Sequence, residues 1–107
     1  MTLYHRTRLV NARAILKQGF KDATGNYLTE SPHTGVWLSN VPLDENEGAI
    51  GDALLEVTLN CLDAEIEFFE WIEDGKPYRE WLMPAAFVNR HAAVRIIEPN
   101  ADSEGNL

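Results

Sequence analysis

Short alternating patterns of apolar and polar residues limit what this chain can fold into. Leu55, Val57 and Leu59 alternate with polar neighbours, which is the pattern of a strand with one buried face. Further strands are predicted at 66–72, buried on both sides, at 78–83 and at 93–97, with a turn or short helix at 84–89. Asp74-Gly75 predicts a hairpin turn. Apolar runs are only a few residues long, too short for a membrane-spanning helix.

The first half of the chain combines a short strand, a helix and a second strand. Residues 3–5 predict the first strand, and a helix is expected from Asn11, as its cap, to Gly19, which ends it. A buried strand is predicted at 35–39, between polar loops at 21–34 and 42–51. The fold class is therefore α+β, in one domain over residues 1–98 with a flexible tail at 99–107.

The composition is that of a small globular protein with an acidic surface. The 107 residues suffice for one domain, and the single cysteine, Cys61, cannot form an internal disulfide. Seventeen acidic and nine basic residues give a net charge of −8, which disfavours nucleic acid as a partner. Because no secretory signal is recognisable, we expect a soluble, cytoplasmic protein. The acidity fits solubility, a basic partner or mimicry of nucleic-acid charge, and composition leaves these open.

Sequence motifs for metal or phosphate binding are missing. The histidines are widely spaced, no Cys-x-x-Cys or His-Glu-x-x-His occurs, and no glycine-rich phosphate loop is present. Cys61 continues the alternation of the 55–59 strand. We therefore predict a buried structural thiol rather than a nucleophile.

Glu80 is the residue that most needs an explanation. It lies in the otherwise apolar segment 78–83, and burying an ionised carboxylate is costly unless it is paired or used. One alternative is a structural role at a sheet edge or in a pairing with an arginine: Arg79, Arg90 or Arg95. His5 and Trp37 also have structural interpretations, as a satisfied histidine and a core aromatic residue.

Three segments follow one another in an informative order. His5-Arg6-Thr7 ends the first strand, and helix residues follow at Asn11, Ile15-Leu16 and Gly19-Phe20. Gly35-Val36-Trp37-Leu38 forms the next strand, and Glu80 lies near the start of a later one. This order, over about residues 2–97, resembles the ADP-ribosyltransferase fold in the branch of diphtheria toxin and the poly(ADP-ribose) polymerases. The resemblance implies a strand-rich split sheet with one early helix.

The resemblance also implies that NAD is the substrate. His5 would bond the adenine-side ribose, Trp37 would stack on nicotinamide, and Glu80 would be the catalytic residue that holds the nicotinamide-ribose 2′-hydroxyl. The implied NAD-binding residues are His5, Arg6, Thr7, Gly35 and Trp37. Arg6 stands where the family has a glycine, and Trp37 where it has a tyrosine.

The expected function is that of a small NAD-dependent mono-ADP-ribosyltransferase with a protein acceptor, or of an NAD glycohydrolase when water is the acceptor. One alternative is a catalytically degenerate member that acts as an acidic protein-binding module. Another is the related RNA 2′-phosphotransferase, which the charge of −8 disfavours. A catalytic Glu80 should line an open cleft with His5 and Trp37, whereas in a binding module it should be salt-bridged or blocked.

Overall fold

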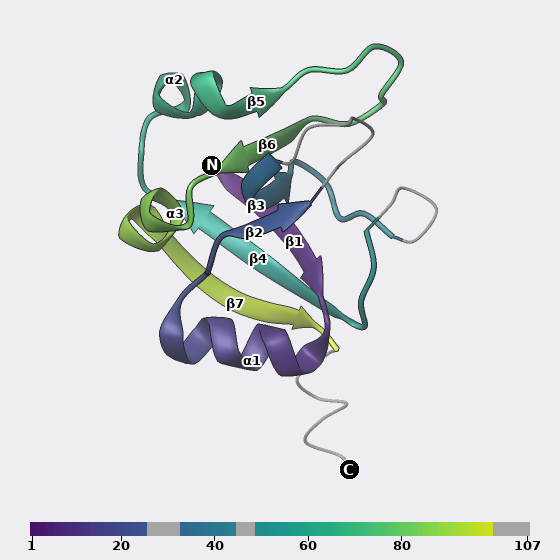
Figure 1. Ribbon diagram of the computed structural model, residues 1–107, viewed down its shortest axis with the longest axis vertical. Helices are drawn as coiled ribbons and strands as arrows, with labels where there is room; N and C mark the ends of the chain where they lie inside the picture. Colours follow the sequence, from purple (N-terminus) through teal and green to yellow (C-terminus); the bar gives the residue numbers. More distant parts are fainter. Residues whose placement is uncertain (26–32, 45–48, 100–107) are drawn as a thin grey trace.

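An antiparallel sheet with three short α-helices makes up the described part of the chain, residues 1–25, 33–44 and 49–99 of the computed structural model (Figure 1). The elements follow in this order: β1 Thr2–Thr7, α1 Leu9–Gln18, β2 Ala23–Gly25, β3 His33–Ser39, β4 Ala53–Leu59, α2 Asp63–Ile66, the 3-10 turn η2 Glu67–Phe69, β5 Glu70–Trp71, β6 Glu80–Met83, α3 Ala85–His91 and β7 Ala92–Glu98. The strand order is β5-β6-β3-β1-β4-β7, and β2 pairs with the beginning of β3. The α+β class is confirmed.

The sheet consists of two well-paired parts with a narrow connection. β1 pairs with β4 along its whole length, and β4 pairs with β7. On the other side, β3 pairs with β6 from Val36 to Ser39. Between β1 and β3, the register has a single pair, Tyr4 with Ser39. The two parts therefore separate on either side of this pair.

The core forms where the inward positions of successive strands meet the helices. The largest fully buried side chains are Trp81, Leu3, Leu38, Leu55, Ile66, Met83, Val57 and Val88. Cross-strand pairing brings Leu3 opposite Val57 and Leu38 opposite Trp81. Burying one side chain of this size contributes about 1.5–3 kcal/mol. α1 packs over β4 and β7, as Figure 1 shows at the lower end of the molecule.

Most predicted elements are confirmed, but the start of the helix is wrong. The strands near 3–5, 35–39, 55–59 and 93–97, the turn at 74–75 and the helix within 84–89 are all present. Gly19 ends α1 with φ 85° while its N–H donates to the Ile15 carbonyl. However, α1 begins at Leu9 rather than after Asn11, because the distant Asp52 carboxylate accepts the Leu9 N–H at 2.9 Å.

The predicted strand over 66–72 is also wrong. It contains the end of α2, the 3-10 turn and only two strand residues. Ile66 is fully buried, but Phe68 and Ile72 are 90% and 82% exposed. Glu65 accepts a hydrogen bond from the Leu62 N–H at 2.7 Å, which stabilises a helical start in spite of the aromatic residues that follow.

Several loop predictions need smaller corrections. The strand expected over 78–83 begins only at Glu80, and the loop expected over 21–34 contains β2 and the start of β3. Within the polar segment 42–51, Leu43 is buried. Cys61 is half-buried and packs against the core. Residues 26–32, 45–48 and 100–107, which include nearly all of the predicted tail, lie outside the described residues.

Candidate active site

The sheet separates next to His5. One residue beyond the Tyr4–Ser39 pair, the His5 ring reaches across to β3, with Nδ1 2.7 Å from the Trp37 carbonyl oxygen. Because a carbonyl only accepts, Nδ1 carries the hydrogen and Nε2 keeps a lone pair. Burial lowers the pKa of His5 below the usual 6.5, and the bond to the carbonyl opposes this shift only in part. His5 is therefore a neutral hydrogen-bond acceptor at Nε2.

A pocket of about 200 Å³ opens beside this contact. It is lined by Tyr4, His5, Arg6, Trp37, Leu38, Ser39, Leu43, Ala49, Ile50 and Glu80, and we refer to it as the glutamate pocket. His5, Trp37 and Glu80 come from three different strands and lie far apart in the sequence. All three residues to which the resemblance assigns roles in NAD binding and catalysis thus line this pocket.

The alternation of β6 places Glu80 on the pocket side. Trp81 and Met83 enter the core, so Glu80 lies on the opposite face of the strand. The carboxylate is nearly buried, with its Oε1 2.7 Å from the Nζ of Lys76. The same ammonium group lies 2.8 Å from a Glu73 carboxylate oxygen. Oε2 of Glu80 has no hydrogen-bond partner among the residues that the structure describes.

The cation beside Glu80 is one that the sequence did not predict. Arg79 binds Glu70 and Arg95 binds Glu56, so neither serves Glu80. Lys76 directly follows the Asp74-Gly75 turn and lies four residues before Glu80. This spacing could have indicated the pair, because a lysine just before a strand can fold its side chain back onto the first residue of that strand.

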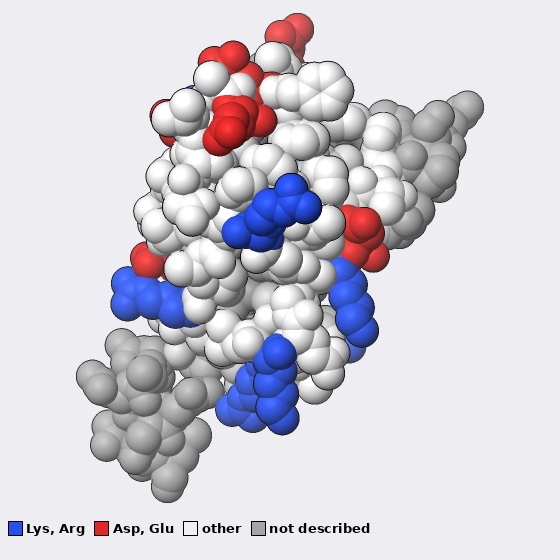
Figure 2. Space-filling model, turned by 90° about the vertical axis from the view of Figure 1, so that its left-hand side faces the viewer, with Lys and Arg blue, Asp and Glu red and all other residues white. Residues whose placement is uncertain are grey.

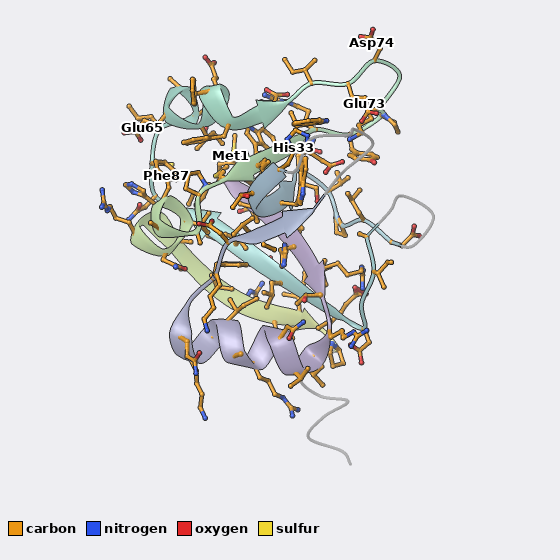
Figure 3. The ribbon with its side chains drawn as sticks, viewed as in Figure 1. Met1, His33, Glu65, Glu73, Asp74 and Phe87 are labelled. Carbon is orange, nitrogen blue, oxygen red and sulfur yellow. The ribbon has the colours of Figure 1, made fainter. Side chains whose placement is uncertain are left out.

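A second tryptophan adds to the aromatic surface beside Glu80. Trp71 pairs with Glu80 across β5 and β6, and its ring packs edge-on against Trp37 at a centroid distance of 5.4 Å. His33 also packs edge-on against the Trp71 ring, at a centroid distance of 4.7 Å, and Figure 3 shows it at the beginning of β3. Trp37 is only half-buried, so it is not a core residue alone. Trp71 was not predicted as a site residue because its segment was expected to be a buried strand.

A second pocket of about 360 Å³ lies along α1. We refer to it as the helix pocket, and its lining residues are His5, Thr7, Asn11, Ala14, Ile15, Gln18, Gly19, Phe20, Lys21, Ala23, Gly35, Val36 and Trp37. The structure thus places the predicted site residues Thr7 and Gly35 here, away from Glu80. His5 and Trp37 line both pockets. Glycine is required at position 35, where φ is 150° and a Cβ would lie 2.9 Å from the Met83 carbonyl oxygen.

The Arg6 side chain holds one wall of the glutamate pocket. Its guanidinium donates to the carbonyl oxygens of Leu43 and Gly51 and binds the Glu98 carboxylate at 2.8 Å. These contacts tie both ends of the 43–51 segment to β1, and Leu43, together with nearby Ile50, lines the pocket. Arg6 thus has a structural task.

Comparisons with known proteins leave the site to be interpreted from its geometry. No protein-family model, curated protein or solved structure matches this chain. Within residues 1–25, 33–44 and 49–99, no cluster of His, Cys, Asp and Glu is arranged to hold a metal ion. No helix in this part of the chain has the length and apolarity needed to cross a membrane.

Proposed function

We propose that this chain is a small NAD-dependent mono-ADP-ribosyltransferase with an ADP-ribosyltransferase-like fold, or an NAD glycohydrolase where water is the acceptor. One observation carries the proposal: His5, Trp37 and Glu80, from three separate strands, line one pocket. The narrow connection between β1 and β3 supports it, because the resemblance implies a split sheet.

The charges of the glutamate pocket suit a ligand that is or becomes cationic. Glu73, Lys76 and Glu80 bring two carboxylates to one ammonium group, so the cluster has an excess of negative charge. Trp37, which lines the pocket, supplies an aromatic face for a planar ring, and Trp71 packs edge-on against it. The oxidised nicotinamide ring of NAD is both planar and cationic.

The proposed reaction uses this excess charge in its transition state. The bond between ribose C1′ and the nicotinamide nitrogen breaks, and its electron pair leaves with nicotinamide, which becomes neutral. Positive charge develops on the ribose, where a fixed carboxylate stabilises it. The acceptor then donates an electron pair to C1′ and loses a proton, for which Glu80 is a suitable base.

The two pockets divide the substrate between them. We place the nicotinamide ribose in the glutamate pocket and the adenosine half along α1 in the helix pocket. Nε2 of His5, at the boundary, then accepts a hydrogen bond from a ribose hydroxyl. Lys21 and the amides of Asn11 and Gln18 line the helix pocket and offer donors to the rest of the molecule.

The test is a titration of the protein with NAD by calorimetry, together with chromatographic detection of released nicotinamide. We expect the wild type to bind NAD and release nicotinamide. Trp37→Phe keeps a stacking face, whereas Trp37→Ala should weaken NAD binding up to about tenfold, the value of one aromatic contact. A wild type that neither binds NAD nor releases nicotinamide contradicts the proposal.

A second candidate function is an acidic protein-binding module, and the Lys76–Glu80 pair favours it. A salt-bridged Glu80 is the arrangement expected when the carboxylate has only a structural task. In that case Lys76→Met lowers the melting temperature, and neither this variant nor the wild type binds or cleaves NAD. A purely structural Glu80 is excluded when the wild type releases nicotinamide and the Glu80→Gln variant does not.

A further inference from the structure

The charges of this chain are divided unevenly between its beginning and the rest. The first 21 residues contain five of the nine basic residues and none of the 17 acidic ones; the first acidic residue is Asp22. A chain with a net charge of −8 thus begins with a cationic segment. This segment comprises β1 and α1.

The cationic segment forms an exposed surface on α1, which we define as the α1 face. Its basic residues are Arg8, Arg13, Lys17 and Lys21, all exposed. Two apolar side chains lie among them, Val10 at 71% and Leu16 at 48% exposure. Spacings of three and seven residues place Val10, Arg13 and Lys17 on one side of the helix.

A surface of opposite charge lies along the outer edge of the sheet, from α2 to the turn after β5. This 62–74 edge has three exposed apolar side chains, Leu62, Phe68 and Ile72, at 73%, 90% and 82% exposure. It also contains six acidic residues and no basic one: Asp63, Glu65, Glu67, Glu70, Glu73 and Asp74. Only Glu70 and Glu73 form ion pairs with Lys or Arg of the described residues.

The two surfaces lie at opposite ends of the molecule. In Figure 1, α2 and β5 form the upper end and α1 the lower end, with the sheet between them. Figure 2 shows acidic side chains gathered at the upper end of one face and Lys and Arg over its middle and lower parts. Figure 3 places Glu65 and Asp74 at the two ends of the 62–74 edge. The surface charge therefore changes from acidic at one end of the long axis to basic at the other.

From this complementarity we propose that the 62–74 edge binds the α1 face of a second copy of the chain. Large exposed apolar side chains along one surface mark interaction sites, and the six acidic residues around them favour a cationic partner. The α1 face offers cations with apolar side chains between them. Because donor and acceptor surfaces differ, the contact is head-to-tail and leads to rings or open chains rather than to a closed two-fold dimer.

Charge reversal on each surface tests this contact. The α1 variant is Arg8→Glu with Lys17→Glu, and the edge variant is Asp63→Lys with Glu67→Lys; all four side chains are exposed. The α1 variant lowers the charge of its face from four positive charges to a net charge of zero, and the edge variant lowers that of its edge from six negative charges to a net two. Each variant thus weakens the attraction between the surfaces, and the apparent dissociation constant should rise by more than about tenfold. In an equimolar mixture, the unchanged edge of the α1 variant can bind the unchanged α1 face of the edge variant, so association should return between the two variants.

The measurement is sedimentation velocity from about 1 µM to about 1 mM, the weak range of specific association. We expect the mass of the wild type to rise with concentration and to rise less at high salt. Phe68→Ser should weaken assembly several-fold, whereas Val41→Ser, an exposed residue outside both surfaces, should leave it unchanged. Circular dichroism checks that each variant folds.

Three results would overturn the proposal. The first is a wild type that stays monomeric throughout the concentration range. The second is assembly that survives both charge reversals, which places the contact elsewhere. The third is a mixture of variants that fails to assemble although each of them is folded.

Discussion

The glutamate pocket and the helix pocket share His5 and Trp37 but differ in charge. A nearly buried carboxylate, that of Glu80, faces the first, with the Glu73–Lys76 pair behind it. Among the described residues that line the helix pocket, there is no carboxylate and one cation, Lys21. The two pockets therefore favour opposite charges on the two ends of one ligand.

In the proposed reaction, the glutamate pocket would carry the chemistry and the helix pocket the binding. A fixed carboxylate is useful where positive charge develops during a reaction, and it contributes less to ground-state binding. Neutral donors and acceptors, such as His5 and the amides of the helix pocket, bind the ground and transition states alike. Variants of the two pockets should thus separate into effects on rate and effects on affinity.

The largest expected effect is that of Glu80→Gln on turnover. Glutamine keeps the shape of the side chain but lacks the negative charge that the developing cation requires. Removing one such electrostatic contact lowers the rate by about 100-fold to 1000-fold. We expect nicotinamide release to fall by this factor, while NAD affinity measured by calorimetry stays within a few-fold of the wild type.

Glu56→Gln is the matched control for this substitution. Glu56 is also ion-paired, with Arg95 at 2.8 Å, but lines neither pocket. Its variant should release nicotinamide at the wild-type rate. Equal rates for Glu80→Gln and the wild type would show that Glu80 is not the catalytic residue.

The next largest effect is expected for Asn89→Ala, at the wall of the helix pocket. The Asn89 side chain accepts the Phe20 N–H at 2.8 Å and donates to the Phe20 carbonyl at 2.9 Å. Asn89→Ala leaves both groups without these partners, so the free energy of unfolding should fall by about 1–3 kcal/mol. Because Phe20 packs against His5 at 5.3 Å, NAD affinity should fall as well, with little change in the rate of the bound complex.

Denaturant unfolding measures the stability change, and Asn60→Ala is its control. Among the described residues, the Asn60 side chain has only an exposed contact with His91, and its backbone hydrogen bond to His91 is kept in the variant. This variant should therefore lose less than about 0.5 kcal/mol. If Asn89→Ala slows the bound complex as strongly as Glu80→Gln, the division between the two pockets is wrong.

His5→Ala should act mainly on affinity. It removes an acceptor that a ribose hydroxyl uses in both ground and transition states, so NAD binding should weaken about fivefold to tenfold, the value of one hydrogen bond. The rate of the NAD-saturated protein should change less than the affinity. Calorimetry and nicotinamide release at saturating NAD measure the two quantities separately. A rate loss as large as that of Glu80→Gln would place His5 in the chemistry instead.

Much of the fold could be predicted because its strands follow local patterns. Leu55, Val57 and Leu59 alternate in the sequence and are buried in β4. The segment around Phe68 could not be predicted in this way, because its aromatic residues favour a strand in isolation. A capping contact of Glu65 and the exposed place of the segment at the sheet edge override that preference.

The residue types of the candidate site could be predicted from the sequence, but the contacts between its side chains could not. The motifs indicated His5, Trp37 and Glu80, and the fold brings them to one pocket. That Lys76 rather than an arginine would serve Glu80 depends on how the chain turns at 74–75, a tertiary property. The Arg6 contacts with Leu43 and Gly51 likewise depend on chain segments that lie about 40 residues away along the sequence.

The smallest expected effect is the pH dependence of stability that comes from His5, the residue at the boundary of the two pockets. Burial lowers its pKa in the folded protein below 6.5, so the unfolded chain binds more protons once the pH falls below that value. The contribution of the neutral ring is therefore complete above pH 6.5 and is lost as the pH falls toward the lowered pKa. The slope is at most about 1.4 kcal/mol per pH unit for one proton.

His5→Asn keeps an N–H donor for the Trp37 carbonyl but does not titrate, while His33 and His91 remain in both proteins. Denaturant unfolding of the wild type and this variant between pH 5 and pH 8 should give curves that run parallel above about 6.5 and diverge below it, with the wild type losing more stability. Curves that stay parallel down to pH 5 would mean that His5 is as easily protonated in the fold as in the unfolded chain, and a neutral Nε2 acceptor between the two pockets would then be wrong.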